Sequence, residues 1–213
     1  MRLCVHEFVT LDGVMQGPGG PDEDRSNGFD RGGWLVPYAD DDFGRIVDGW
    51  FADAEVILLG RSTYSMMQPY WSEVTDTDDR VATVLNTFPK YVASTTLTEQ
   101  TATWTNTTVL PDPVLHPVRE LKDRPGGELQ VHGSWQLVRS LHDAGLVDVY
   151  RLLVFPVVLG DGKRLFEPGT VPSGFLTKSS ELTAAGVVSL VLEPGPLADA
   201  GTFVVEDGRE TVG

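Results

Sequence analysis

The sequence contains very little cysteine, few basic residues and no long hydrophobic run. Cys4 is the only cysteine among 213 residues, which excludes an intramolecular disulfide framework and is typical of a reducing compartment. Lysine and arginine number 16 against 31 aspartates and glutamates, and the net charge of -15 leaves no broad basic face for nucleic acid. No apolar run reaches membrane-spanning length and no leader-like segment opens the chain, so we expect a cytoplasmic protein without a membrane partner.

Two kinds of motif are missing as well. The 4 histidines, together with Cys4, show no spacing typical of metal ligands, so we predict no metal site. No G-x-G-x-x-G sequence follows the first predicted strand, which disfavours a Rossmann dinucleotide-binding domain. His6 and His132 fall inside predicted strands, and we interpret them and Cys4 as interior side chains rather than ligands.

Apolar strands alternate with amphipathic helices along most of the chain, which is long enough for one domain with a substantial core. Strands are expected at residues 3–10, 56–59, 90–94, 129–132 and 148–154, and helices at residues 40–52, 62–67, 79–87, 118–122 and 135–144. The last third is β-rich, with strands at 175–182 and 187–192 pairing around Ala185-Gly186. This order predicts an α/β fold with a mostly parallel central sheet, antiparallel C-terminal strands and flanking helices.

Three segments are expected to lie outside regular structure. Residues 17–33 are dense in glycine, proline and aspartate, which is typical of a long surface loop. A proline-rich loop is expected to begin at Val109. We assign residues 1–192 to a single domain and residues 193–213 to a C-terminal tail that is partly ordered through Phe203-Val204-Val205.

Residues 129–138 are the most informative, because an apolar strand turns through Gly133-Ser134 directly into an amphipathic helix. The first N–H groups of a helix lack partners and carry the positive end of its dipole, so such a turn can hold phosphate. A second strand ends in a similar way at Gly60-Arg61-Ser62-Thr63-Tyr64. Plain α/β connectivity is the commoner reason for a strand–glycine–helix turn, so the pattern by itself leaves both interpretations open.

Six short motifs occur in a fixed order: Thr10-Leu11-Asp12-Gly13, Gly60-Arg61-Ser62-Thr63-Tyr64, Pro69-Tyr70-Trp71, Val131-His132-Gly133-Ser134, Leu146-Val147-Asp148 and Pro156-Val157-Val158-Leu159-Gly160-Asp161-Gly162-Lys163-Arg164-Leu165-Phe166. Together they resemble the dihydrofolate reductase superfamily, in the branch typified by the RibD C-terminal reductase domain of bacterial riboflavin biosynthesis. The resemblance runs from about residue 3 to about residue 192. It implies a dihydrofolate-reductase-like fold and an NADPH-dependent reductase acting on a small heterocyclic or ribosylamino-pyrimidine-like substrate.

The resemblance also implies cofactor contacts. Arg61 and Thr63 match phosphate contacts, and a fixed cation with a neighbouring hydroxyl suits phosphate oxygens. Thr95 stands where an arginine often contacts the 2′-phosphate, so NADPH is the expected cofactor and its preference over NADH stays open. The expected cofactor-binding residues are Gly13, Met15, Gly60, Arg61, Thr63, Ser94, Thr95, Gly133, Ser134, Trp135 and Gln136.

Substrate contacts follow from the same resemblance. Tyr70, Trp71 and Leu159 are expected in the substrate cleft, with core packing as the alternative for the two aromatic residues. Asp42 is the nearest match to the carboxylate that contacts the substrate ring in dihydrofolate reductases, although an aspartate in the first turn stabilises any helix. Hydride transfer requires no protein nucleophile, because the cofactor carries the chemistry.

A second function remains open on the same fold, namely a non-catalytic nucleotide- or small-ligand-binding protein. The sequence has no H-x-E and P-C-x-x-C motif of a zinc deaminase, which fits a reductase that has diverged from riboflavin biosynthesis. Turnover of NADPH separates the two functions, whereas cofactor binding does not.

The C-terminal half carries a prediction about assembly. Residues 152–155 and 187–192 are almost continuously apolar, whereas a strand with one wet face would alternate. Both faces must therefore be covered, either by helices of the same chain or by a second subunit. Because proteins of the branch that the sequence resembles commonly pair through this half, we expect a homodimer.

Overall fold

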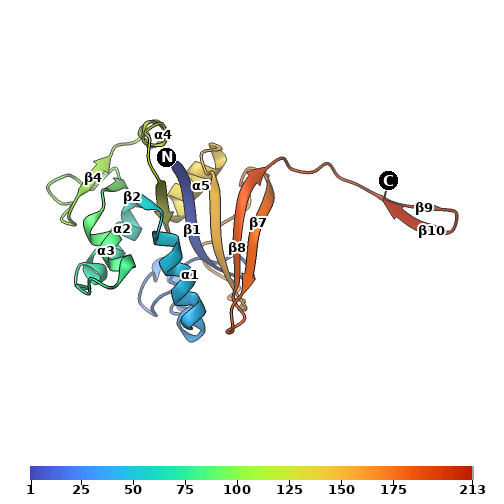
Figure 1. Cartoon of the computed structure of the whole chain (residues 1–213), viewed down its shortest axis with the longest axis horizontal. Helices are drawn as coiled ribbons and strands as arrows, with labels where there is room; N and C mark the ends of the chain where they lie inside the picture. Colours follow the sequence, from blue (N-terminus) through green and yellow to red (C-terminus); the bar gives the residue numbers. More distant parts are fainter. Residues whose placement is uncertain (213) are drawn as a thin grey trace.

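The computed structural model describes residues 1–212 of the chain. Its centre is an 8-stranded sheet with the order β4-β3-β2-β5-β1-β6-β8-β7 (Figure 1). The strands are β1 (Arg2–Thr10), β2 (Ala54–Gly60), β3 (Lys90–Ala93), β4 (Thr107–Leu110), β5 (Glu128–His132), β6 (Val149–Phe155), β7 (Gly174–Leu182) and β8 (Val188–Gly195). The helices are α1 (Asp41–Phe51), α2 (Arg61–Trp71), α3 (Arg80–Thr87), α4 (Leu115–Lys122) and α5 (Trp135–Asp143), with short 3-10 turns at Ser26–Gly28 and Val36–Tyr38.

Helices cover both faces of the sheet. On one face, called the α5 face below, Val118 of α4 and Leu141 of α5 are buried against Val131 of β5. On the other, called the α1 face, Trp50 of α1 shares a buried cluster with Ile57 of β2 and with residues of α2 and α3. Strand β2 is apolar throughout its centre because successive side chains point to opposite faces and both faces are covered.

The pairing directions establish the fold class. Every neighbouring pair from β4 to β6 is parallel, whereas β6–β8 and β8–β7 are antiparallel. The expectation of an α/β fold with a mostly parallel sheet and antiparallel C-terminal strands is therefore confirmed. Within residues 1–212, no helix is both long and apolar enough to cross a membrane.

Two sequence-based boundaries were wrong. Residues 107–110 form strand β4, where a loop was expected to begin at Val109, because pairing with β3 orders this short edge segment. Helix α4 begins at Leu115, ahead of Pro117, since proline is tolerated in a first turn whose N–H groups lack partners. Helix α2, whose beginning was expected at residues 62–67, continues through Pro69 to Trp71.

Residues 17–33, expected as a surface loop, are tied to the body of the protein. The side-chain amide of Gln16 donates to the carbonyl oxygens of Asp24 (3.1 Å) and Ser26 (3.0 Å). Lys163 forms an ion pair with Asp24 at 2.7 Å, and Phe29 is buried in the α1-face core. Glycine and proline thus mark a segment without regular structure, but side chains outside it fix its course.

A buried polar cluster lies on the α1 face beneath α1. The Arg151 guanidinium donates two hydrogen bonds to the Glu128 carboxylate, at 2.6 and 2.7 Å, and contacts His6 Nε2 at 2.8 Å. The His6 ring stacks between those of Trp50 and His132, at centroid distances of 5.1 and 4.8 Å. Among the described residues, His6 Nδ1 has no hydrogen-bond partner. These groups join β5, β1 and β6 beneath the helix.

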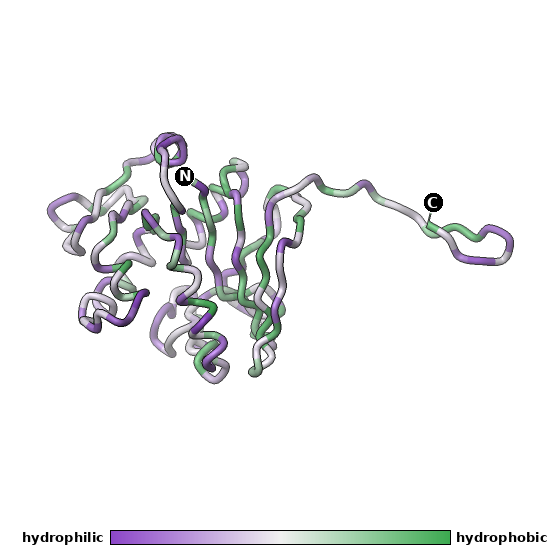
Figure 2. Tube along the Cα trace, in the orientation of Figure 1, coloured by the Kyte–Doolittle hydropathy of each residue, from purple (hydrophilic) through white to green (hydrophobic). Residues whose placement is uncertain are grey.

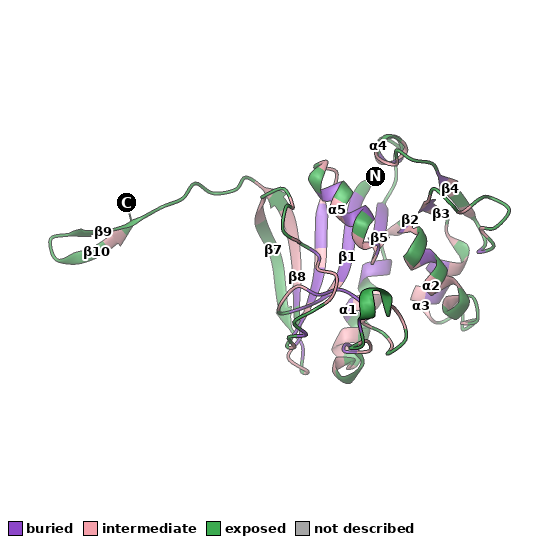
Figure 3. Ribbon diagram, turned by 180° about the vertical axis from the view of Figure 1, so that it is seen from behind, coloured by how far each residue is buried: buried purple, intermediate pink, exposed green. Residues whose placement is uncertain are grey.

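The chain beyond β8 forms an arm, defined here as residues 196–212. It runs away from the sheet and ends in a hairpin of β9 (Phe203–Glu206) and β10 (Arg209–Val212), as Figure 1 shows. Seen from behind, almost the whole arm is exposed (Figure 3). The tail expected at residues 193–213 therefore includes the end of β8 and a regular hairpin.

Candidate functional site

Three strands end side by side at one edge of the sheet. Strands β3, β2 and β5 are neighbours and parallel, and Gly60 at the end of β2 is opposite Ala93 at the end of β3. The segments that follow them therefore meet at this edge: Ser94 after β3, Arg61 after β2 and Gly133 after β5. In open α/β sheets, ligands bind beyond the carboxyl ends of the strands. The topology places most of the expected cofactor residues there.

Two helices begin at this edge. Helix α2 starts directly after β2, with Gly60 as its N-cap, and α5 starts after β5, with Ser134 as its N-cap. Within residues 1–212, no side chain caps either helix. Uncapped first turns leave backbone N–H groups free to bind a ligand, and the helix dipoles favour negative charge there. Phosphate groups suit such a pair of helix starts.

The two helix starts are joined to each other by hydrogen bonds. The N–H of Gly60 donates to Ser134 Oγ at 2.8 Å, and the N–H of Ser134 donates to Thr63 Oγ1 at 2.9 Å. Ser134 Oγ in turn donates to the carbonyl oxygen of His132 at 2.9 Å. Ser134, expected as a phosphate contact, thus uses both its N–H and its hydroxyl proton within the protein. The Thr63 hydroxyl keeps its own proton for a ligand.

Gly133 lies directly beneath Thr63. Its φ of +55° belongs to the left-handed region, and a Cβ at this position would lie 3.2 Å from Thr63 Cγ2 and 3.3 Å from Thr63 Oγ1. Ser134, with φ of 65°, has the same backbone conformation. Both the backbone conformation and the close approach of α2 therefore favour glycine here. This close cradle is the observation that fits a bound pyrophosphate.

Arg61 supplies a positive charge at the start of α2. Its side chain is exposed, and no carboxylate of residues 1–212 lies within ion-pair distance of it. Beside it, Ser94 Oγ accepts hydrogen bonds from the N–H groups of Thr96 (3.1 Å) and Leu97 (2.8 Å), and Thr95 is exposed. Arg61 thus carries a positive charge without a carboxylate partner among residues 1–212.

Asp12 turns the chain at the end of β1. Its carboxylate accepts hydrogen bonds from the Thr10 hydroxyl (2.6 Å) and from the N–H groups of Gly160 (2.8 Å) and Leu159 (3.2 Å). Burial opposes ionisation, but these hydrogen bonds outweigh it and lower the pKa of Asp12 to about 2. An ionised Asp12 ties the segment after β6 to the end of β1.

Gly13 and Met15, which were expected to contact the cofactor, are held by backbone hydrogen bonds to the segment that follows β6. Gly13, with φ of +79°, accepts a hydrogen bond from Leu165 N at 3.0 Å, and Met15 N donates to Lys163 O at 2.9 Å. The Met15 side chain is buried in the α5-face core. Gly13 therefore stays near the edge, whereas Met15 presents backbone rather than side chain to it.

The first turn of α5 carries two further expected cofactor residues. Trp135 is partly buried and its Nε1 donates to the carbonyl oxygen of Arg164 at 3.1 Å, with Lys163 Nζ lying 5.7 Å from its ring centre. Gln136 is exposed. The backbone N–H groups of these two residues follow the Gly133-Ser134 turn, where an anion would meet them.

Asp42 lies in the first turn of α1, next to the turn between β7 and β8. Its carboxylate accepts a hydrogen bond from Ala184 N at 3.2 Å and pairs with Arg45 at 3.3 Å. Asp40, the N-cap of α1, likewise accepts from Ala185 N at 2.9 Å. Both carboxylates thus hold the β7–β8 turn, and this contact competes with the substrate role expected for Asp42.

The three residues expected in the substrate cleft are spread over different surroundings. Tyr70 is exposed on the last turn of α2, and Trp71 packs partly against the α1-face core. Leu159 is buried in that same core. Helix α2 spans roughly 15 Å from Arg61 to Trp71 at 1.5 Å per residue, so its two ends serve different regions.

Sequence reasoning missed a buried acid in β1. Glu7 of β1 is 4 % exposed, and its Oε1 has no hydrogen-bond partner among the described residues. Glu7 points to the same face of the sheet as Val5 and Val9, which belong to the α5-face core. Burial raises the pKa of Glu7 well above its usual range, because desolvation disfavours the charged carboxylate. A charged residue inside an alternating apolar strand was the available signal.

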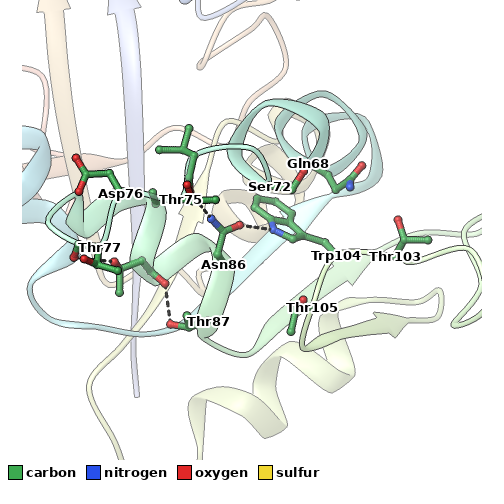
Figure 4. Close-up of a pocket in the computed structure, with 13 residues that line it drawn as sticks. Gln68, Ser72, Thr75, Asp76, Thr77, Asn86, Thr87, Thr103, Trp104 and Thr105 are labelled. Atoms are coloured by element: carbon green, nitrogen blue, oxygen red, sulfur yellow. Dashed lines mark hydrogen bonds between the residues drawn. The ribbon is translucent and has the colours of Figure 1, made fainter.

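A cavity of about 340 Å³ lies at the far end of α2 from Arg61. It is bounded by that end of α2, by α3 and by the segment before β4 (Figure 4). Asn86 connects these elements. Its amide donates to the carbonyl oxygens of Trp71 (2.9 Å) and Val74 (3.2 Å), and its oxygen accepts from Trp104 Nε1 at 2.8 Å. None of the expected cofactor or substrate residues lines this cavity, so it is separate from the site described above.

Comparisons with known proteins identify the family to which the sequence is similar. The family model described as the RibD C-terminal domain matches residues 2–189. The uncharacterized protein YyaP of Bacillus subtilis (strain 168) is 28% identical over 194 residues, covering 89% of this chain and 93% of that protein.

Solved structures are similar at the level of the fold. A putative riboflavin biosynthesis protein from Shewanella sp. PV-4 has a TM-score of 0.65 at 18% identity, covering 92% of this chain and 99% of that one. Dihydrofolate reductase from Enterococcus faecalis, complexed with NADP(H) and RAB-propyl, has a TM-score of 0.58 at 10% identity, covering 91% and 96%. With the family model extending over nearly the whole sheet, the chain belongs to the RibD C-terminal domain family, whose fold is that of the dihydrofolate-reductase-like reductases.

Proposed function

We propose that this protein is an NADPH-dependent reductase that passes hydride to a small heterocyclic or ribosylamino-pyrimidine-like substrate. The observation that carries the proposal is the pair of uncapped helix starts, α2 and α5, joined through Thr63 and Ser134 with Arg61 unpaired beside them. Membership of the RibD C-terminal domain family supports the reaction class. NADP(H) in the Enterococcus faecalis dihydrofolate reductase supports the choice of cofactor.

The residues at this edge suit different parts of the cofactor. The N–H groups of Trp135 and Gln136 would bind the pyrophosphate, and the Thr63 hydroxyl would donate to it. Arg61 would hold the 2′-phosphate, since Thr95 and Ser94 are neutral. When bound, the cofactor supplies the hydride. The protein binds and orients both reactants and excludes water, which is sufficient for this chemistry.

The substrate is proposed to lie over the α1 face beside the end of β1. Phe8 of β1 and Phe43 of α1 are only partly buried there, with ring centroids 5.6 Å apart. Partly exposed aromatic rings favour stacking with a flat heterocycle. Asp42 lies next to Phe43 in α1, so a substrate role for its carboxylate would require release of the Ala184 N–H.

The protein is also proposed to form a homodimer through the outer strands of the sheet. Leu190 and Leu192 of β8 are only partly buried on the α5 face, and Val188 is exposed. The helices of the chain therefore leave part of this apolar face uncovered. A second copy would cover it, as expected for strands with apolar side chains on both faces.

Single-turnover oxidation of NADPH tests the function. The protein would be mixed with NADPH and with a ribosylamino-pyrimidine or a reduced-pterin precursor, and loss of NADPH fluorescence would be followed. We expect oxidation with at least one substrate class. Tight NADPH binding without oxidation across these substrates would instead favour the non-catalytic ligand-binding function.

A further inference from the structure

The hairpin at the end of the arm has one apolar, exposed face. Phe203 and Val205 are two residues apart on β9 and therefore point to the same face. Val212 of β10 is directly opposite Phe203, so the three side chains share that face. They are 71%, 77% and 77% exposed, respectively. Hydrophobic colour returns within the arm at this hairpin in Figure 2. We call these three residues the hairpin patch.

Such a hairpin is not expected to be stable by itself. An isolated two-stranded hairpin is marginally stable at best in water, because it buries too little apolar surface to offset the cost of ordering the chain. The hairpin patch contacts nothing in its own chain that would bury it. A partner surface that accepts apolar side chains would therefore stabilise this conformation.

A matching apolar surface exists on the same chain. Val188, Leu190 and Leu192 share the α5 face of β8, and Val154 and Leu182 are directly opposite Val188 on the neighbouring strands. Leu182 is 68% exposed and Val188 36% exposed. We call these five residues the sheet strip. Figure 3 shows the exposed and half-exposed strands β7 and β8 beside the buried centre of the sheet.

The root of the arm directs it away from this strip in its own chain. Pro194 and Pro196 restrict the backbone on either side of Gly195. The chain at Pro196 passes so closely over Gly174 that a Cβ on Gly174 would lie 2.0 Å from the carbonyl oxygen of Pro196. This contact fixes where the arm leaves the sheet, and the hairpin ends far from the strip (Figure 1).

The arm and the strip therefore fit an exchange between two copies. We propose that, in the homodimer proposed above, the arm of each subunit crosses to the other and packs its hairpin patch on the partner's sheet strip. Residues 196–202 can span roughly 23 Å when extended, at about 3.3 Å per residue, which is about the length of β8. The arm leaves from the end of β8, which carries part of the sheet strip. A single two-fold axis that relates the two strips therefore brings each arm to the partner's strip.

Paired charge substitutions in the full-length chain test the exchange. Phe203→Asp with Val205→Asp introduces charge into the hairpin patch, and Val204→Asp with Thr211→Asp introduces the same charge on the other hairpin face. Leu182→Asp with Val188→Asp alters the strip, with Leu176→Asp as its control on the opposite face of β7. Light scattering over a concentration series gives the dimer dissociation constant.

We expect the patch variant and the strip variant each to raise the dissociation constant about tenfold or more, since both lose apolar anchors at the interface. The controls should stay within about twofold of the unaltered protein. Mixing the patch variant with the strip variant should restore dimers, because one intact arm then meets one intact strip. That rescue is specific to exchange between copies.

Three outcomes would overturn the exchange. If the unaltered protein is a monomer at tens of micromolar, both the homodimer and the exchange fail. If the protein is a dimer and the patch variant dimerises as well as its control, the exchange fails while the homodimer stands. Failure of the mixed variants to associate would likewise overturn it, because an arm that packs on its own strip cannot be rescued by a second chain.

Discussion

The backbone N–H of Ser134 donates to the side-chain oxygen of Thr63 at 2.9 Å, across 71 residues of sequence. This bond joins the first turns of two helices that follow neighbouring strands. It fixes the distance between two sets of free N–H groups and orients the Thr63 hydroxyl toward the same edge. Cofactor binding should therefore depend on Thr63 through geometry as well as through direct contact.

Replacing Thr63 tests this link. Thr63→Val keeps the shape of the side chain but leaves the Ser134 N–H without its acceptor, which should cost about 1–3 kcal/mol of folding stability. NADPH binding should weaken as well, because the two helix starts lose their fixed spacing. Thr63→Ser retains the hydroxyl and serves as the control. Urea denaturation and fluorescence titration with NADPH measure the two effects, and equal behaviour of both variants would contradict this role.

Arg61 tests the assignment of the 2′-phosphate. Arg61→Ala should weaken NADPH binding by about 1.5–3 kcal/mol, the range for a lost charge-assisted hydrogen bond. Binding of NADH, which lacks the 2′-phosphate, should change little. Arg119→Ala in the last turn of α4 is the control. Calorimetric titration with both dinucleotides measures the difference, and an unchanged NADPH dissociation constant would remove Arg61 from the site.

Gly133 tests the close approach of the backbone. Gly133→Ala places a Cβ against Thr63 and holds an L-residue at φ of +55°, which should cost about 1–2 kcal/mol of stability and weaken NADPH binding. Gly208→Ala carries similar backbone strain in the arm, with open space around the new Cβ, and should leave NADPH binding unchanged. Binding as tight as in the unaltered protein would show that no ligand approaches Gly133.

The stacked histidines predict a loss of stability in acid. Burial, followed by the charge of Arg151, lowers the pKa of His132 to about 3, and burial with nearby His132 lowers that of His6 well below 6.5. Unfolding therefore takes up protons below pH 6.5, and stability should fall by up to about 1.4 kcal/mol per pH unit for each histidine. His132→Asn should reduce this slope in urea denaturation, whereas exposed His116→Gln should not.

Glu7 predicts the opposite pH dependence. Burial raises the pKa of its carboxyl in the folded protein, whereas the unfolded chain ionises it near its usual pKa of about 4.5. Its contribution is therefore present below that value and is lost as the pH rises. As the pH is raised from acid to mildly alkaline, the free energy of unfolding of Glu7→Gln should increase relative to that of the unaltered protein. Exposed Glu210→Gln should show no such trend. A difference in stability between Glu7→Gln and the unaltered protein that does not change with pH would contradict the raised pKa of Glu7.

Local sequence was sufficient for most elements of the fold. The apolar run at β2 and the strand–glycine–helix segment around Gly133 identified parallel strands and the helix starts that follow them. Strand β4 was not predicted, because a short edge strand acquires its structure from pairing with β3. The start of α4 was misplaced at Pro117, since proline is tolerated in a first turn whose N–H groups lack partners.

The sequence by itself determined the fold class and the two helix starts after Gly60 and Gly133, because periodicity and turn chemistry are local properties. Only the tertiary structure decided which of those residues meet. It joined Thr63 to Ser134, gave Asp42 the Ala184 N–H as its partner, and buried Glu7 without a hydrogen-bond partner for its Oε1 among the described residues. These outcomes depend on contacts between distant segments, where packing and desolvation, rather than local propensity, set the geometry and the charge.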